Sequence, residues 1–392
     1  MGIVSIISSA YFMLGDNIYS KKISKAFLIT SNLANRIRRC NNENTLIYLS
    51  ESEKEYLIER KIISLSINDN NPICIQSDMN ECRLFIQLTN KCNLHCKHCF
   101  VESDMKNEDF YTFERVRNLI DTAVSYGINR IDFTGGEVFV QTYFLDILSY
   151  LDLLPVSYSF FTNLTIPDEE TLSRLVNLNG LMCIITSLDY FGEKHNIFRG
   201  NQHAFQKTIK NIMWLRDRGV KVVVNIMVMD DNHDDVTKMT DFLLSESIEV
   251  HFDTVIECGR AKGGSLSNKN DNNNNNNIRF INELLNNIRM RGVQVDNMAG
   301  SCGVSKTLIF AHYTGEFMLC PGLTEDISPK YHLGSDMRVA WEKANKMNIE
   351  CSKKQCEHWS KCSHGCRLRA LVDNGMDDAP DDMMCRLMSI EE

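Results

Sequence analysis

Two apolar patterns alternate along the middle of the chain. Short apolar runs such as RLFIQLT (83–89) and VKVVVNIMV (220–228) are typical of buried parallel strands. Between them, segments such as TFERVRNLIDTAVSYG (112–127) carry apolar residues every three or four positions, the pattern of an amphipathic helix. The predicted strands are 83–89, 129–134, 156–163, 181–189, 220–228 and 250–256, with helices between them.

Strands that alternate with helices predict parallel βαβ units. Because crossovers between parallel strands are right-handed, this number of strands predicts an α/β protein with a partial (β/α)6 barrel over residues 81–300, similar in plan to a TIM barrel. In such barrels the functional residues lie at the carboxyl ends of the strands. We therefore expect the site among the residues that follow each strand.

The two flanking regions have different characters. Residues 1–80 read as a small α+β unit without a sharp motif, and residues 301–392 are rich in cysteine and in loops. In the second region we expect metal sites to substitute for an apolar core. The polar segment NKNDNNNNNN (268–277) is interpreted as an exposed insertion loop of the barrel.

Charge and cysteine usage narrow the function. The net charge of −9 gives no general attraction to nucleic acid or anionic lipid, so we expect neither as a partner. The apolar start MGIVSIISSAYFML lacks the basic segment of a signal peptide and is too short to cross a bilayer. Fifteen cysteines without a secretory signal indicate metal binding rather than a disulfide framework.

Three cysteines follow the first predicted strand, in NKCNLHCKHCF (90–100). Cys92, Cys96 and Cys99 stand at CxxxCxxC spacing. Three thiolates on one loop suit three corners of a cubane iron–sulfur cluster, whose fourth iron is then open to a small chelating molecule. Structural zinc is the alternative, but it takes four ligands, so His95 or His98 would have to complete the set despite lying beside a cysteine.

Polar residues follow three further strands. FTGGEVF contains Gly135, Gly136 and Glu137; paired glycines allow close backbone approach, and a carboxylate accepts strongly from an ammonium group. A simple turn with a surface glutamate is the alternative for this segment. The other strand-end candidates, each of which could instead be a structural hydrogen-bonding residue, are Asn163, Ser187, Asp189 and Arg199.

CxxxCxxC directly after the first strand of a β/α barrel resembles the radical S-adenosylmethionine (radical SAM) superfamily. The resemblance implies that Cys92, Cys96 and Cys99 hold a [4Fe–4S] cluster and that the amino and carboxylate groups of SAM chelate the open iron. One electron then cleaves SAM to methionine and a 5′-deoxyadenosyl radical, which abstracts hydrogen from the substrate. It also implies that the GGE segment receives the methionyl ammonium, although Val138 stands where the family usually has proline. The remaining strand-end candidates would contact the ribose and carboxylate of SAM.

The C-terminal cysteines resemble the SPASM extension of radical SAM enzymes. Cys302, Gly315 and Cys320 match its Cx9–15Gx4C half, while four residues separate Cys351 from Cys356 where the family has two. The resemblance implies two auxiliary [4Fe–4S] clusters. Their ligands would be Cys302, Cys320 and Cys366 for the first, and Cys351, Cys356, Cys362 and Cys385 for the second.

The first auxiliary set lacks an obvious fourth ligand, so we hypothesise an open or substrate-occupied iron, with Cys258 as an alternative fourth ligand. A pair of zinc sites is the other interpretation of the C-terminal cysteines, because sets of cysteine ligands also suit zinc.

This resemblance favours a peptide maturase that forms thioether or carbon–carbon crosslinks on a precursor peptide. Residues 1–80 would then recognise the leader peptide by strand addition. An anaerobic sulfatase-maturating enzyme that forms formylglycine is the alternative, and a non-catalytic, metal-stapled interaction module is a third interpretation. We expect a reductant such as flavodoxin or ferredoxin and a cytoplasmic, low-oxygen setting.

Overall fold

The structure is a computed structural model. It describes residues 11–14, 17–20, 26–28 and 82–389, apart from 155, 264–265, 267–270, 292–307, 324–326, 328, 348–350, 354–355, 358–361 and 363–364. The helices and strands expected between residues 29 and 80 lie outside the described residues, as does Cys302.

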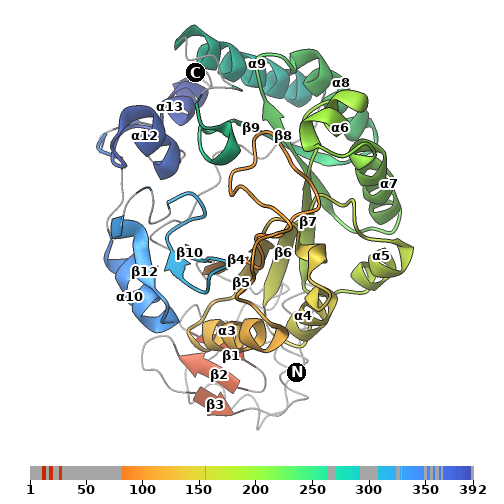
Figure 1. Ribbon diagram of the computed structural model, residues 1–392. Coiled ribbons are helices and arrows are strands. Elements are labelled where there is room, and N and C mark those ends of the chain that lie inside the picture. The colour runs from red at the N-terminus through yellow and green to blue at the C-terminus, as the bar shows by residue number, and fades with distance from the viewer. Residues whose placement is uncertain are drawn as a thin grey trace, which may run out of the picture.

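Parallel strands in chain order form the centre of the fold (Figure 1). Each strand is hydrogen-bonded to the next one along the chain, which is the pairing that right-handed βαβ units produce. The predicted partial β/α barrel is confirmed. Its strands are β4 (Arg83–Gln87), β5 (Arg130–Thr134), β6 (Ser157–Phe161), β7 (Leu181–Ser187), β8 (Val222–Val228) and β9 (Glu249–Thr254).

Helices on the outside of the sheet connect these strands (Figure 1). They are α3 (Phe113–Ser125), α4 (Phe144–Leu151), α5 (Glu169–Val176), α6 (Glu193–Arg199), α7 (Ala204–Arg216), α8 (His233–Ser245) and α9 (Asp271–Met290), with short 3-10 turns η1 (Val138–Val140) and η2 (Gly259–Ala261). Helix α3 begins at Thr112, whose hydroxyl accepts from the Arg115 amide, and is followed by Gly127 at φ 87°. The helix therefore ends where a residue able to adopt a left-handed conformation allows the chain to turn.

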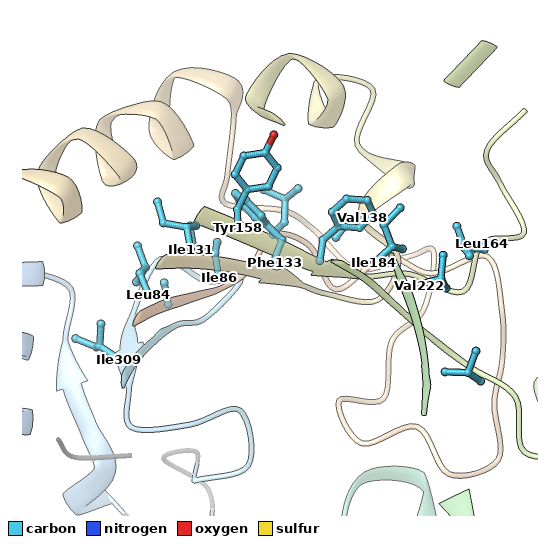
Figure 2. Packing of buried hydrophobic residues seen from close by; sticks show 14 of the residues in the cluster. Leu84, Ile86, Ile131, Phe133, Val138, Tyr158, Leu164, Ile184, Val222 and Ile309 are labelled. Atoms are coloured by element: carbon cyan, nitrogen blue, oxygen red, sulfur yellow. The ribbon is translucent and has the colours of Figure 1, made fainter. Parts of the chain in front are cut away.

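The main core lies between the sheet and the overlying helices. Ile131, Phe133 and Tyr158 point from the strands toward the helices and are fully buried (Figure 2). Val116 and Ile120 of α3 belong to the same cluster. The apolar positions that predicted these elements are therefore the ones that pack, and burial of this area provides the main drive for folding.

The C-terminal region extends the sheet beyond the predicted barrel. Strand β10 (Leu308–Ala311) pairs in parallel with β4, and β11 (Phe317–Met318) and β12 (His332–Gly334) follow it. The remaining elements are η3 (Pro329–Tyr331) and helices α10 (Met337–Lys346), α12 (Arg367–Asn374) and α13 (Asp382–Ser389). Several of their side chains join the main apolar core. The expectation that metal sites substitute for apolar packing here is wrong for these elements.

The Asn-rich segment is also different from the prediction. Residues 271–277 form the first turns of α9, so the interpretation of this part as an exposed loop is wrong, while 268–270 lie outside the described residues. Asn277 is buried; its amide donates to Asp230 Oδ1 at 2.8 Å, and its Oδ1 lies 2.6 Å from His233 Nε2. These tertiary hydrogen bonds offset the low helix propensity of asparagine.

Near the N-terminus, β1 (Tyr11–Leu14), β2 (Asn17–Ser20) and β3 (Ala26–Leu28) form an antiparallel sheet in the order β1-β2-β3. All three strands lie within residues 1–80, the range of the predicted α+β unit. Within the described residues, no helix is long and apolar enough to cross a membrane.

Candidate active site

The three-cysteine loop begins where β4 ends and lies inside the ring of helices (orange in Figure 1). Its backbone is hydrogen-bonded to the turn that follows β5: Gly136 N donates to Thr89 O and Glu137 N donates to Lys91 O, both at 2.8 Å. The loop and the GGE turn, which are far apart in sequence, are therefore one structural unit.

The backbone of the cysteine loop lies so close to this turn that both positions require glycine. A Cβ on Gly135 would lie 2.7 Å from Thr89 O, and one on Gly136 would lie 2.2 Å from Lys91 O. No side chain fits at either distance without moving the backbone. The glycine pair thus brings the turn against the residues that precede Cys92.

The three cysteines of the loop belong to one small apolar cluster. Cys96 is buried with Leu94 and Ala204, and Cys92 and Cys99 pack against this cluster. Burial raises the pKa of Cys92 to about 12, and the neighbouring Glu137, Cys96 and Cys99 charges add to the effect. Because burial raises the pKa of Cys92 and of Cys96, these thiols stay protonated unless a cation compensates their charge, and the irons of a cluster would provide that compensation. The three cysteines fit a [4Fe–4S] cubane in which three of the four irons have a thiolate ligand from the protein.

Helix α6 supports the outer side of the loop. His95 N donates to Arg199 O at 3.0 Å and Lys97 N donates to Phe198 O at 3.1 Å, so the end of α6 acts as a backbone template for the loop. His95 is exposed, and the His98 ring stacks on Phe198 at 4.8 Å between centroids. Burial lowers the pKa of His98 to about 4. Within the described residues, no group of three His, Cys, Asp or Glu side chains is suited to hold a single metal ion.

A buried ion pair joins α6 to the loop and to β7. Arg199 Nη2 donates to Asp189 Oδ2 at 2.5 Å, and Arg199 Nη1 lies 3.6 Å from Cys96 Sγ. Asp189 is buried, and although burial alone would raise its pKa, the Arg199 charge holds the pKa below its usual range. Among the described residues, Arg199 Nε has no acceptor. Both predicted residues therefore lie beside the cysteine loop.

Glu137 links the ends of β5 and β6. Its Oε1 accepts from Thr162 Oγ1 at 2.7 Å and from Phe139 N at 3.1 Å, and its Oε2 accepts from Asn163 N at 2.7 Å. The side chain is fully buried, and burial raises the pKa of Glu137 to about 7. It is therefore a buried carboxylate, unlike the surface residue of a simple turn.

Asn163 lies next to the cysteine loop. Its Nδ2 donates to Asn93 Oδ1 at 3.0 Å and lies 4.0 Å from Cys92 Sγ. The next residue, Leu164, adopts φ 56°, a left-handed conformation that is unfavourable for leucine. Asn211 holds it in place by donating from Nδ2 to Leu164 O at 2.9 Å. Ser187, the last residue of β7, is half-buried opposite Asn225 of β8.

Sequence reasoning missed Arg260, which follows β9 and braces the loop from a third side. Arg260 Nε donates to Cys96 O at 2.9 Å, its Nη1 donates to Ser103 O at 3.0 Å, and its backbone N donates to Cys99 O at 3.0 Å. Its position a few residues after the sixth strand was the available signal. No pattern of residue types marks an arginine that binds backbone carbonyls.

Several of the C-terminal cysteines influence one another electrostatically. The thiolate charges of Cys351 and Cys356 add to the effect of burial in raising the pKa of Cys362, and the charges of Cys362 and Cys351 act in the same direction on Cys385. Cys362 is therefore close enough to Cys351 and Cys356 for their charges to affect it, and Cys385 is close enough to Cys362 and Cys351. Cys320 and Cys366 of the first set pack against the main core.

The fold and the loop together define a class of protein. Residues 86–243 match the family model described as Radical SAM superfamily. The chain therefore contains a radical SAM domain, and the matched segment runs from β4 into α8 and includes the three-cysteine loop, the GGE turn and Arg199. A [4Fe–4S] cluster and SAM are the cofactors of this superfamily.

Two proteins of known name are similar to part of the chain. The chain is 32% identical over 160 residues to the antilisterial bacteriocin subtilosin biosynthesis protein AlbA of Bacillus subtilis, covering 40% of this chain and 36% of that protein. It is 26% identical over 163 residues to the sporulation killing factor maturation protein SkfB of the same organism, covering 40% and 38%. The aligned segments thus span less than half of each of these relatives.

Solved structures extend the comparison to the fold of the whole chain. Streptococcus suis SuiB aligns with a TM-score of 0.63 and 16% identity over 97% of this chain and 99% of its own. The anSMEcpe structure with bound AdoMet aligns with a TM-score of 0.62 and 18% identity over 78% of this chain and 94% of its own. At these identities the likeness is one of fold.

Proposed function

We propose that the protein is a radical SAM peptide maturase, which cleaves SAM reductively and abstracts hydrogen from a precursor peptide to form a thioether or carbon–carbon crosslink. The observation that carries the proposal is the loop that brings Cys92, Cys96 and Cys99 into one cluster and is hydrogen-bonded to the GGE turn at the carboxyl end of the sheet. When bound, the cluster and SAM supply the electron and the 5′-deoxyadenosyl radical.

The chain's own residues hold and orient these groups. Arg199 places a permanent positive charge beside Cys96 and favours its thiolate form, which is the form that binds iron. Loop backbone atoms are fixed from three sides, by the GGE turn, by the end of α6 and by Arg260. Such bracing keeps the ligands in place and excludes water from the site.

The side chains of Glu137 and Arg199 each keep a hydrogen-bonding position for SAM. A carboxylate offers about four acceptor positions, and Glu137 uses three of them within the protein, so one position remains for the methionyl ammonium. Arg199 retains Nε as a donor for the SAM carboxylate among the described residues. Asn163, Ser187 and Asp189 complete the proposed SAM site.

We assign the C-terminal region, 301–392, to two auxiliary [4Fe–4S] clusters. Cys351, Cys356, Cys362 and Cys385 form the second ligand set, which their mutual electrostatic influence supports. Without metal, burial raises the pKa of Cys362 and Cys385, so these thiols also need a cationic partner to ionise.

Three observations favour a peptide substrate. The fold alignment with SuiB bound to its precursor peptide SuiA covers 98% of this chain, whereas the alignment with anSMEcpe covers 78%. AlbA and SkfB carry names that denote bacteriocin biosynthesis and maturation. In the described N-terminal sheet, β1 and β3 are edge strands, which suit capture of a leader peptide by strand addition. We therefore assign residues 1–80 to leader recognition and residues 81–300 to the radical SAM barrel.

The first test is SAM cleavage. Anaerobically reconstituted protein, reduced with dithionite in the presence of SAM, should release 5′-deoxyadenosine, and replacement of Cys92, Cys96 and Cys99 by alanine should abolish the release. Cys183→Ala is the matched control, because Cys183 is a half-buried cysteine on β7 that hydrogen-bonds to Ser159. If fully iron-loaded parent protein releases none, the proposal is wrong.

The second test concerns the substrate. A short peptide encoded beside this gene should lose two hydrogen atoms on incubation with the reduced enzyme and SAM, as judged by mass spectrometry. A sulfatase-derived peptide, tested in parallel, should not gain the hydrazide-reactive aldehyde of formylglycine. Aldehyde formation on that peptide, without any change in the encoded peptide, would favour the sulfatase-maturating alternative. The expected electron donor is flavodoxin or ferredoxin, in a cytoplasmic, low-oxygen setting.

A further inference from the structure

The cysteine loop has a solvent-facing side that the proposed SAM site does not use. His95 and Lys97 are exposed, whereas Cys96 between them is buried, so successive side chains point to opposite sides of this part of the loop. Glu137 and Arg199, which keep hydrogen-bonding positions for SAM, are also buried. SAM is therefore expected on the buried side of the loop, and the exposed side is left without an assigned role.

A basin of about 450 Å³ lies on this exposed side and is lined by His95, Lys97, Arg260 and Leu266. Lys97 and Arg260 carry permanent positive charges, and none of the described residues that line the basin carries a carboxylate. Lys262, two residues after Arg260, is exposed as well. Because the chain has a net charge of −9, this basic basin is opposite in sign to the protein as a whole.

The basic basin adjoins the backbone of two of the loop cysteines. Arg260 Nε donates to Cys96 O at 2.9 Å, and the Arg260 backbone N donates to Cys99 O at 3.0 Å. Lys97 follows Cys96 directly in the chain. A molecule seated in the basin would therefore lie against the backbone that carries the proposed cluster ligands. Since electron transfer slows steeply with distance, this contact offers a short path for an electron into the cluster.

Apolar side chains accompany the positive charges. Leu266 lines the basin itself. Ile197 of α6 is 62% exposed, and the next residue, Phe198, accepts from Lys97 N at 3.1 Å through its backbone oxygen. Exposed apolar groups beside charged ones are typical of protein–protein interfaces, which combine an apolar centre with a polar rim. The surface therefore suits a protein partner better than a free anion.

We infer that the basic basin, together with Ile197, is the docking surface for an acidic one-electron carrier protein that reduces the radical SAM cluster. The inference rests on the proposed function, because only SAM cleavage requires an electron at this loop. In each transfer the carrier is oxidised by one electron and the cluster is reduced by one, and no atom passes between the two proteins.

Charge and position favour a carrier over the peptide substrate. Complexes of electron-transfer partners are small and short-lived, and opposite charges guide their association. The peptide, in contrast, has to reach the buried side of the loop, where SAM is expected and where water is excluded from the radical. The basin on the exposed side fits the carrier's requirements, which are proximity to the cluster and a positive surface.

The inference is tested in full-length, anaerobically reconstituted protein. SAM cleavage is driven either by dithionite or by reduced flavodoxin at varied concentration, and release of 5′-deoxyadenosine is measured for the parent, Lys97→Glu, Lys97→Arg and Lys238→Glu. Lys238 is an exposed lysine of α8 that does not line the basin, so its substitution makes the same change in net charge elsewhere. Iron analysis and circular dichroism verify that each variant is loaded and folded.

With dithionite, all variants should release 5′-deoxyadenosine at the parent rate, because a small reductant needs no docking surface. With flavodoxin, Lys97→Glu should raise the KM for flavodoxin by about tenfold at low salt and leave kcat unchanged, since charge reversal weakens electrostatic guidance. Lys97→Arg and Lys238→Glu should keep the parent KM. At roughly 0.5 M salt, where the Debye length is about 4 Å, the variants should converge. Biolayer interferometry should show the same loss of flavodoxin binding in the absence of SAM.

A KM for flavodoxin that is no higher in Lys97→Glu than in Lys238→Glu would overturn the inference. An equal loss with dithionite would overturn it too, because Lys97 would then act on the cluster itself. The inference also fails if dithionite drives release by the parent but neither flavodoxin nor ferredoxin does. If the parent releases nothing even with dithionite, the proposed function is wrong, and flavodoxin binding to the parent and to Lys97→Glu still decides whether the basin is a docking surface.

Discussion

The Asp189–Arg199 pair provides a direct test of how the cysteine loop is braced. Arg199→Gln removes the guanidinium that donates to Asp189 and lies beside Cys96. Asp189, which is 1% exposed, then keeps one hydrogen-bond donor to its side chain among the described residues, the Met227 amide at 3.2 Å. Breaking a buried ion pair from one side costs about 3–5 kcal/mol, because the other charge stays buried without its partner.

This cost can be measured as a change in resistance to urea. With an m-value of roughly 3 kcal/mol per molar urea, a loss of about 3–5 kcal/mol lowers the unfolding midpoint by about 1–1.7 M. Far-UV circular dichroism under anaerobic conditions follows the transition in the reconstituted protein. The same variant should also bind less iron at the radical SAM site, because Cys96 loses its neighbouring positive charge.

A second ion pair on the same helix serves as the matched control. Lys194 Nζ lies 2.8 Å from Asp235 Oδ2; the lysine side chain is 65% exposed and the aspartate side chain 8%. Because solvent reaches the lysine and screens the pair, Lys194→Gln should lower the midpoint by clearly less than Arg199→Gln does. The two substitutions remove the same charge from the same helix and differ mainly in burial.

The double variant Asp189→Asn/Arg199→Gln completes a thermodynamic cycle. It should be more stable than Arg199→Gln alone, because it leaves no buried charge unpaired. Strictly additive losses, or a midpoint for Arg199→Gln equal to that of Lys194→Gln, would refute the reasoning.

Three further outcomes follow from the geometry of the site. Burial raises the pKa of Glu137 to about 7, so between about pH 4 and pH 7 the folded state binds more protons than the unfolded state, and stability falls as the pH rises through this range. Glu137→Gln should remove this fall, which urea midpoints measured across the same pH range would show. Gly136→Ala should abolish iron binding at the radical SAM site, since its Cβ would overlap Lys91 O, and iron analysis measures this. Arg260→Ala should lower iron retention on dilution without changing the auxiliary signals, and EPR distinguishes the two.

Most of the barrel could be predicted because apolar residues recur along its strands and helices at the spacing typical of each. Helix α3 shows why: Val116, Ile120, Ala123 and Val124 form one buried stripe that both the sequence and the structure display. Gly127 and Gly219, at φ 87° and 78°, follow the ends of α3 and α7 and allow the chain to turn there.

Helix α6 escaped prediction because its buried face is polar. His195, Asn196 and Arg199 are buried beside Phe198, so apolar periodicity does not detect the helix. The helix begins after Gly192 and ends at Gly200, which adopts a left-handed conformation at φ 70°. Its burial follows from contact with the cysteine loop, which is a tertiary effect that local sequence cannot express.

Long-range pairing explains the misjudged C-terminal region. The four residues of β10 are too short to signal a strand securely, and their partner β4 lies more than two hundred residues earlier in the chain. In the site, spacing alone predicted the cysteines and the paired glycines, since both patterns are local. The role of Arg260 depends on contacts between distant segments, which composition and spacing do not encode.

The most direct measurement concerns the open iron of the radical SAM cluster. Protein that keeps Cys92, Cys96 and Cys99 but carries alanine at the auxiliary cysteines is reduced, and its EPR spectrum is recorded with and without SAM. We expect SAM to change the signal and SAM labelled in its amino or carboxylate group to show coupling of the label to the cluster. A signal that SAM leaves unchanged in fully iron-loaded protein would contradict the account.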